Sequence, residues 1–193
     1  TINNAKDREI PYFRYLQTER IANVDFISDQ LDPLNWTQDF KYLCSKFEED
    51  TSELFHFIGF YTSSESKDTQ YNIMVGNEFR IPIENLKKVN QDSLLFLSMR
   101  CGSNGPRKPE DFLIYISKLL DVGAKGVVGS AYPIPDNFSA VFAEKFYKRF
   151  LLGWEIGDTI LSLKQLFLSE FNTPLALFYT IFTNLKNPNV RLS

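Results

Sequence analysis

Few residue types in this chain can do covalent chemistry, and two of them stand beside predicted strands. Cys101 follows the apolar run "SLLFLSM", and His56, the single histidine, lies in "ELFHFIGF". In an α/β enzyme, a cysteine at the end of a buried strand takes the position of a nucleophile. An imidazole on a neighbouring strand would raise the thiolate fraction and later protonate the leaving amine. Cys101 and His56 are therefore the candidate catalytic pair of a cysteine peptidase.

The elements that must position this pair follow from the hydrophobic pattern. Short apolar runs alternate with amphipathic stretches of helical period. The runs predict strands near 53–59, 93–99, 126–130 and 175–182, and the stretches predict helices near 110–121, 137–151 and 156–170. A hairpin is predicted in "YNIMVGNEFRIPI", turning at Gly76-Asn77. The strands are apolar throughout, as in buried parallel strands covered by helices on both faces.

The predicted fold class is therefore α/β, a three-layer sandwich with a mostly parallel central sheet flanked by helices. Residues 1–193 are interpreted as one domain. Residues 1–35 mix aromatic and charged side chains, and the pattern defines no element there beyond an edge strand and a short helix. The helices before Gly123 and Gly153 are predicted to end at those glycines.

Composition and charge exclude several classes of function. The chain has 21 basic and 24 acidic residues and no basic stripe, which argues against nucleic acid as a partner. No apolar run reaches the roughly 18 residues of a membrane span. One histidine and two cysteines do not assemble a zinc site of the usual kind, so no metal and no cofactor are predicted. The loop "GSNG" lacks the lysine of a P-loop, which makes nucleotide binding the weakest alternative.

Cysteine usage bears on the compartment. Cys44 lies on the apolar stripe of "NWTQDFKYLCSKFEED", which is typical of a core position. Together with Cys101 it makes no disulfide framework. The prediction is a reducing, cytoplasmic setting.

The stretch "GAKGVVGSAYPIPDNFSAVFAEKFYKRFLLG", residues 123–153, resembles the CHAT domain family. The family pattern is "GA-x-G-V-(V/I)-G-(S/T)-x-W-x-(V/I)-x-D", followed by "F-x-x-x-F-Y-x-x-L-x-x-G". The likeness extends over roughly residues 50–183. It implies a caspase-like fold related to separase, often found behind tetratricopeptide repeats in bacterial signalling and defence systems.

The same resemblance places the catalytic positions on other residue types. The family histidine strand resembles "x-x-H-F-x-G-H-G"; its first histidine matches His56, its catalytic one falls on Phe60, and the next glycine falls on Tyr61. The cysteine position falls on Arg100, so Cys101 comes one residue late. A one-residue slip turns a side chain to the other face of the sheet unless a bulge restores it.

The position of His56 also argues against catalysis. It precedes position 60 by four residues, about 13 Å at strand rise. We expect a packed core histidine that donates to backbone. Phe60, Tyr61 and Arg100 then line a pocket for a substrate or partner.

Asp136 completes the predicted pocket. The resemblance implies an acidic residue near the pocket that receives the anchoring side chain of the substrate, and Asp136 also stands where a helix N-cap is expected. The edge of "GNEFRIPI" offers backbone groups to which a peptide strand can pair.

Two functions follow. In the first, the chain is a catalytically inactive pseudopeptidase that binds a protein or peptide, with an attached or separate repeat-containing chain as one such partner. In the second, a local bulge brings Cys101 to the site with His56, and the chain is an active cysteine endopeptidase. The first is favoured, because bulky Phe60 and Arg100 would fill a catalytic site.

Overall fold

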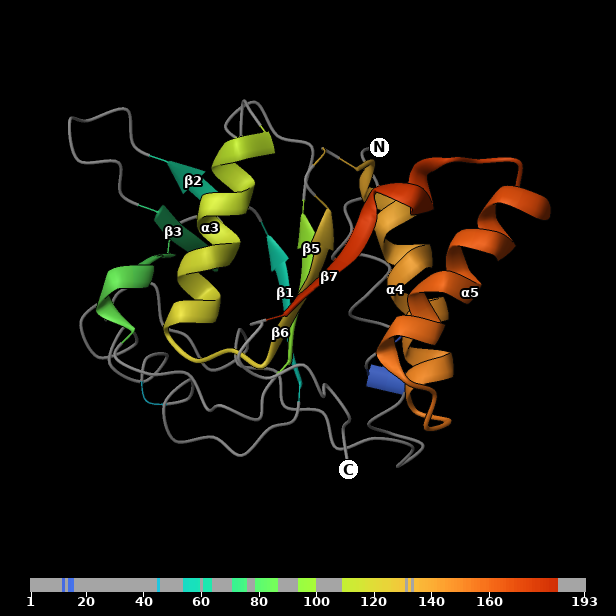
Figure 1. The fold of residues 1–193 in the computed structure, drawn as a ribbon, viewed down its shortest axis with the longest axis horizontal. Coiled ribbons are helices and arrows are strands. Elements are labelled where there is room, and N and C mark those ends of the chain that lie inside the picture. The colour runs from blue at the N-terminus through green and yellow to red at the C-terminus, as the bar shows by residue number, and fades with distance from the viewer. Residues whose placement is uncertain are drawn as a thin grey trace.

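A computed structural model of the chain defines the architecture (Figure 1). It describes residues 12, 14, 15, 45, 54–59, 61–63, 71–75, 79–86, 94–99, 109–130, 132 and 134–183. The strands are β1 (Leu54–Gly59), β2 (Tyr61–Ser63), β3 (Tyr71–Val75), β4 (Phe79–Pro82), β5 (Leu94–Met99), β6 (Gly126–Ser130) and β7 (Tyr179–Thr183). The helices are α3 (Pro109–Asp121), α4 (Asp136–Phe150) and α5 (Ile156–Ser169), with 3₁₀ turns at Ile83–Asn85 and Leu175–Phe178.

The main sheet has four strands in the order β1-β5-β6-β7. β1 and β5 are parallel along their whole length, from Leu54 opposite Leu94 to Gly59 opposite Met99. β5 and β6 are also parallel, whereas β6 and β7 are antiparallel. A mixed α/β fold with a mostly parallel sheet is therefore confirmed.

The last predicted strand is wrong over its first half. Residues 175–178 form a 3₁₀ turn, and β7 begins only at Tyr179. The turn starts after Pro174, whose carbonyl accepts a hydrogen bond of 2.9 Å from the Leu177 amide. The run "LALF" is apolar in either conformation, so hydrophobicity alone does not separate a strand from one helical turn.

A second, antiparallel sheet contains β2, β3 and β4. β3 and β4 pair from Asn72 opposite Pro82 to Val75 opposite Phe79. This pairing confirms the predicted hairpin, although its turn at Gly76-Asn77 lies outside the described residues.

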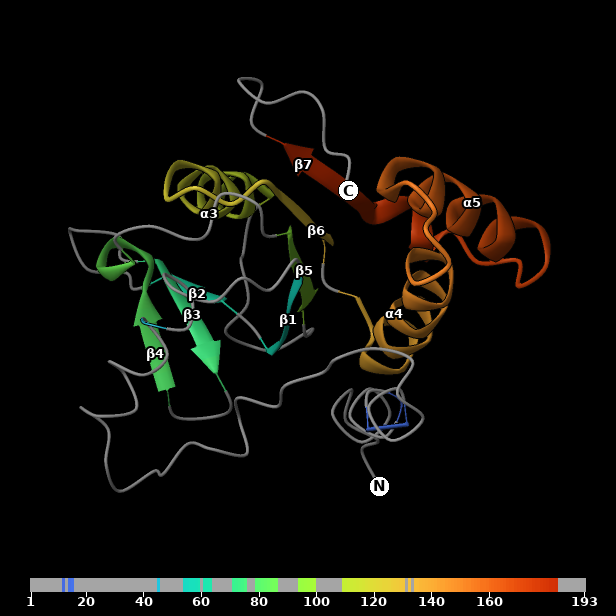
Figure 2. The same cartoon turned by 90° about the horizontal axis from the view of Figure 1, so that it is seen from below.

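The three helices lie within two residues of their predicted bounds, and Figures 1 and 2 show α3 on one side of the four-strand sheet and α4 and α5 on the other. Alternation along β7 explains how both sides are filled. The Tyr179 ring stacks on Phe142 of α4 with centroids 3.9 Å apart, while Phe182 meets Phe112 of α3 edge to face at 5.6 Å.

The larger core lies between the sheet and the helix pair α4–α5. It joins the sheet residues Leu94 and Val128 to helix residues that are almost wholly buried. These helix residues are Phe142, Phe146, Ile160, Leu163 and Phe167. They recur at helical spacing, which is why the sequence pattern predicts both helices.

Glycines end the helices as predicted. Gly123 has φ 114° and Gly153 has φ 82°, values that side chains rarely adopt. Within the part of the chain that the structure describes, no helix has both the length and the apolar character needed to cross a membrane.

Candidate functional site

The candidate site lies at the carboxyl ends of the parallel strands, where open α/β sheets bind their ligands. β1 and β5 end level with each other, at Gly59 and Met99. The two positions to which the resemblance assigns catalysis, 60 and 100, follow these strands directly in the sequence. Phe60, Arg100 and Cys101 lie outside the described residues, and Tyr61 is described as the first backbone position of β2, opposite Ile73.

His56 does not lie at this strand end. It stands opposite Phe96 in the middle of β1, three residues and about 10 Å before Gly59. Its Nδ1 is 2.9 Å from the hydroxyl oxygen of Tyr147 on α4. The two rings are stacked, with centroids 5.5 Å apart and planes 11° from parallel. His56 is thus packed against α4, and the hydroxyl of Tyr147 is a polar partner of its ring.

Strand alternation explains the direction of the imidazole. Leu54 packs against the α4–α5 core, and His56 shares its face because side chains two apart point the same way. Phe55 is buried on the opposite face. Tyr147 is itself buried, with 5% of its surface exposed, so its hydroxyl needs a partner inside the protein. His56 meets that need.

The importance of Tyr147 is not predicted from the sequence. One signal was available, because Tyr147 belongs to the "F-Y" pair of the family pattern. A tyrosine on the buried face of a helix requires a polar partner inside the protein. The single histidine of the chain lies in a predicted buried strand and was one candidate for that partner.

The end of β6 carries a further feature that the sequence pattern does not reveal. The buried Ser130 hydroxyl donates to the Tyr132 carbonyl at 2.9 Å and accepts from the Tyr132 amide at 3.2 Å. This closed turn leaves Tyr132 half exposed, 4.9 Å from the Phe178 ring between centroids. An exposed aromatic pair therefore stands at the same edge of the sheet as the candidate site.

Asp136 is not the N-cap of α4. The helix begins at Asp136 itself, and Pro135 occupies the cap position with φ −57° and ψ 136°. The Pro135 carbonyl accepts hydrogen bonds of 3.0 Å from the amides of Phe138 and Ser139. Proline is suited to this place because its ring holds φ near −65°. A recognition role for Asp136 stays a prediction.

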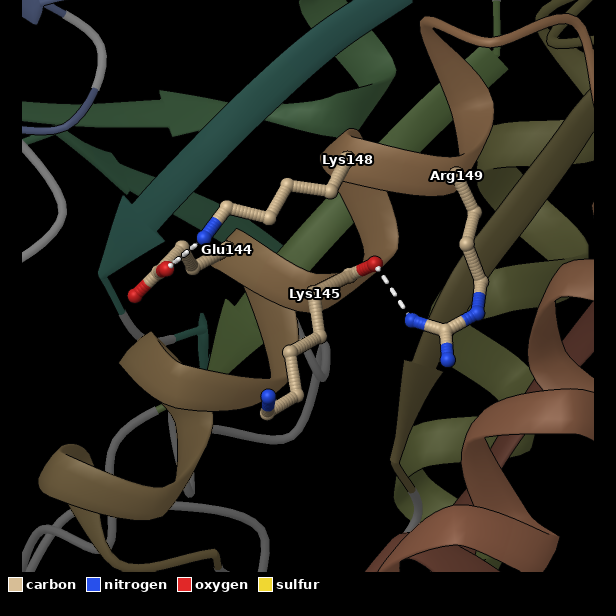
Figure 3. A network of polar contacts seen from close by, with 4 residues as sticks. All are labelled: Glu144, Lys145, Lys148 and Arg149. Atoms are coloured by element: carbon tan, nitrogen blue, oxygen red, sulfur yellow. Dashed lines mark hydrogen bonds and ion pairs between the residues drawn. The ribbon is translucent and has the colours of Figure 1, made fainter.

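Charged residues gather instead on the second half of α4, as Figure 3 shows. Lys148 pairs with Glu144 one turn earlier. The Arg149 guanidinium donates to the Lys145 carbonyl and to the Ser162 hydroxyl, each at 3.2 Å, and its centre lies 6.0 Å from the Trp154 ring centroid. Of these contacts, the hydrogen bond from Arg149 to Ser162 joins α4 to α5, and none involves the strand ends.

No family model matches the chain, and no curated protein matches its sequence. The resemblance to CHAT domains therefore stands on the quoted residues alone. In the described part of the chain, no group of three or more His, Cys, Asp or Glu residues is placed to hold a metal ion.

Proposed function

We propose that this chain is a caspase-like domain of the CHAT type, a three-layer sandwich that has lost peptidase activity and binds a protein or peptide. The helices on the two sides of a mostly parallel sheet support this architecture. The family pattern over residues 123–153 supports the relationship. CHAT domains commonly occur in bacterial signalling and defence systems, often behind tetratricopeptide repeats. The resemblance therefore favours an intracellular role of that kind, with a repeat-containing chain as partner.

One observation carries the loss of activity. The imidazole of His56 is stacked on Tyr147 and hydrogen-bonded to its hydroxyl, about 10 Å before the end of β1. The sequence contains no second histidine. A Cys–His pair at the strand ends would require this side chain to leave the β1–α4 interface and abandon a buried tyrosine hydroxyl.

The binding role is supported by the surface at the same edge. Tyr132 and Phe178 present two neighbouring aromatic rings there, with 49% and 40% of their surfaces exposed. Exposed aromatic rings give peptide-binding surfaces large contact areas at low cost in conformational entropy. An apolar peptide side chain is the ligand that such a pair would contact.

Thiol labelling tests the loss of activity. Limiting iodoacetamide at neutral pH is expected to label Cys101 no faster than a free peptide thiol, because the single imidazole that could stabilise its thiolate is held at Tyr147. His56→Ala is expected to leave that rate unchanged. Circular dichroism of the wild type and of His56→Ala checks that both chains fold. Labelling of Cys101 many times faster than the peptide, abolished by His56→Ala, would establish the alternative, an active cysteine endopeptidase.

Partner capture tests the binding role. A partner isolated with the wild-type chain is expected to bind more weakly to Arg100→Glu, which reverses the charge at the predicted pocket. Lys148→Glu reverses a charge on α4 away from the strand ends and serves as the control. Equal binding by the wild type and Arg100→Glu would place the interface elsewhere.

A further inference from the structure

We draw no further inference here: the strongest candidate, the exposed apolar patch of Leu151, Leu152 and Trp154 at the turn between α4 and α5, carries none, because nothing in the described part of the chain shows what covers it.

Discussion

The hydroxyl of Tyr147 lies 2.9 Å from Nδ1 of His56, and the two rings stack almost in parallel. The pair joins the edge strand β1 to α4 across 91 residues of sequence. It gives a buried tyrosine its polar partner, and it holds the single imidazole away from the strand ends. The same contact therefore contributes to stability and argues against catalysis.

Tyr147→Phe tests the hydrogen bond while retaining the stacked ring. Its loss leaves Nδ1 of His56 without this partner and is expected to lower the free energy of unfolding by about 1 kcal/mol. Urea unfolding measures the change. Tyr132→Phe, which alters a half-exposed tyrosine, is the control and should stay within about 0.5 kcal/mol of wild type. If Tyr147→Phe changed stability no more than this control, the hydrogen bond would contribute nothing.

A double-mutant cycle isolates the pair itself. Tyr147→Phe and His56→Ala should together cost less than the sum of the single changes, because either one removes the same contact. Additive costs would show that the two side chains act on stability independently.

Gly126 in β6 is expected to reject a side chain. A Cβ there would lie 3.1 Å from Cδ1 of Leu94 and 3.4 Å from the Phe182 carbonyl oxygen. Leu94 is wholly buried and has little room to shift, so Gly126→Ala should lower the free energy of unfolding by roughly 1–3 kcal/mol.

Gly157→Ala provides the matched control for Gly126→Ala. Nothing lies within 4 Å of its Cβ position, and alanine is the better helix former, so stability should rise by roughly 0.5 kcal/mol. Thermal denaturation compares the two variants. If Gly126→Ala were as stable as the wild type, the side chain of Leu94 would have to shift to make room for the added methyl group.

The contacts of Arg149 are expected to contribute more to the free energy of unfolding than the ion pair of Lys148. Arg149→Met removes two hydrogen bonds and the contact with Trp154, for an expected loss of about 1–2 kcal/mol. Lys148→Met breaks an exposed ion pair and a contact with the Tyr12 ring, whose centroid is 5.9 Å from Nζ, and should cost less than Arg149→Met. Urea unfolding of both variants decides the order, and equal costs would contradict it.

Alkaline pH is expected to destabilise the protein through Tyr12. Burial, followed by the charges of Glu144 and Tyr15, raises the pKa of Tyr12 from 10.0 to about 12. The unfolded chain therefore loses this proton first as pH rises, and stability falls between about pH 10 and about pH 12. In urea unfolding, the free energy of unfolding of Tyr12→Phe should fall less steeply with pH than that of the wild type between about pH 10 and about pH 12. Near neutral pH the two proteins should show the same dependence on pH. An identical alkaline slope would contradict the raised pKa.

The sequence pattern predicts the main elements because burial repeats along them with a fixed period. Apolar runs locate β1, β5 and β6, and helical spacing locates α3, α4 and α5 to within two residues. Over residues 175–178 the pattern fails, since an apolar run is compatible with both a strand and a 3₁₀ turn. At Asp136 it fails by one position, because the proline before it already occupies the cap.

The sequence by itself determined that this chain has one imidazole and two thiols, and that its strands are apolar enough to be buried in a mostly parallel sheet. Only the tertiary structure decided which group the imidazole meets. The direction of His56 follows from strand alternation, but its partner lies 91 residues away on α4. Which helix covers which face of a sheet depends on packing between segments that are distant in the sequence. The local hydrophobic pattern does not predict that packing.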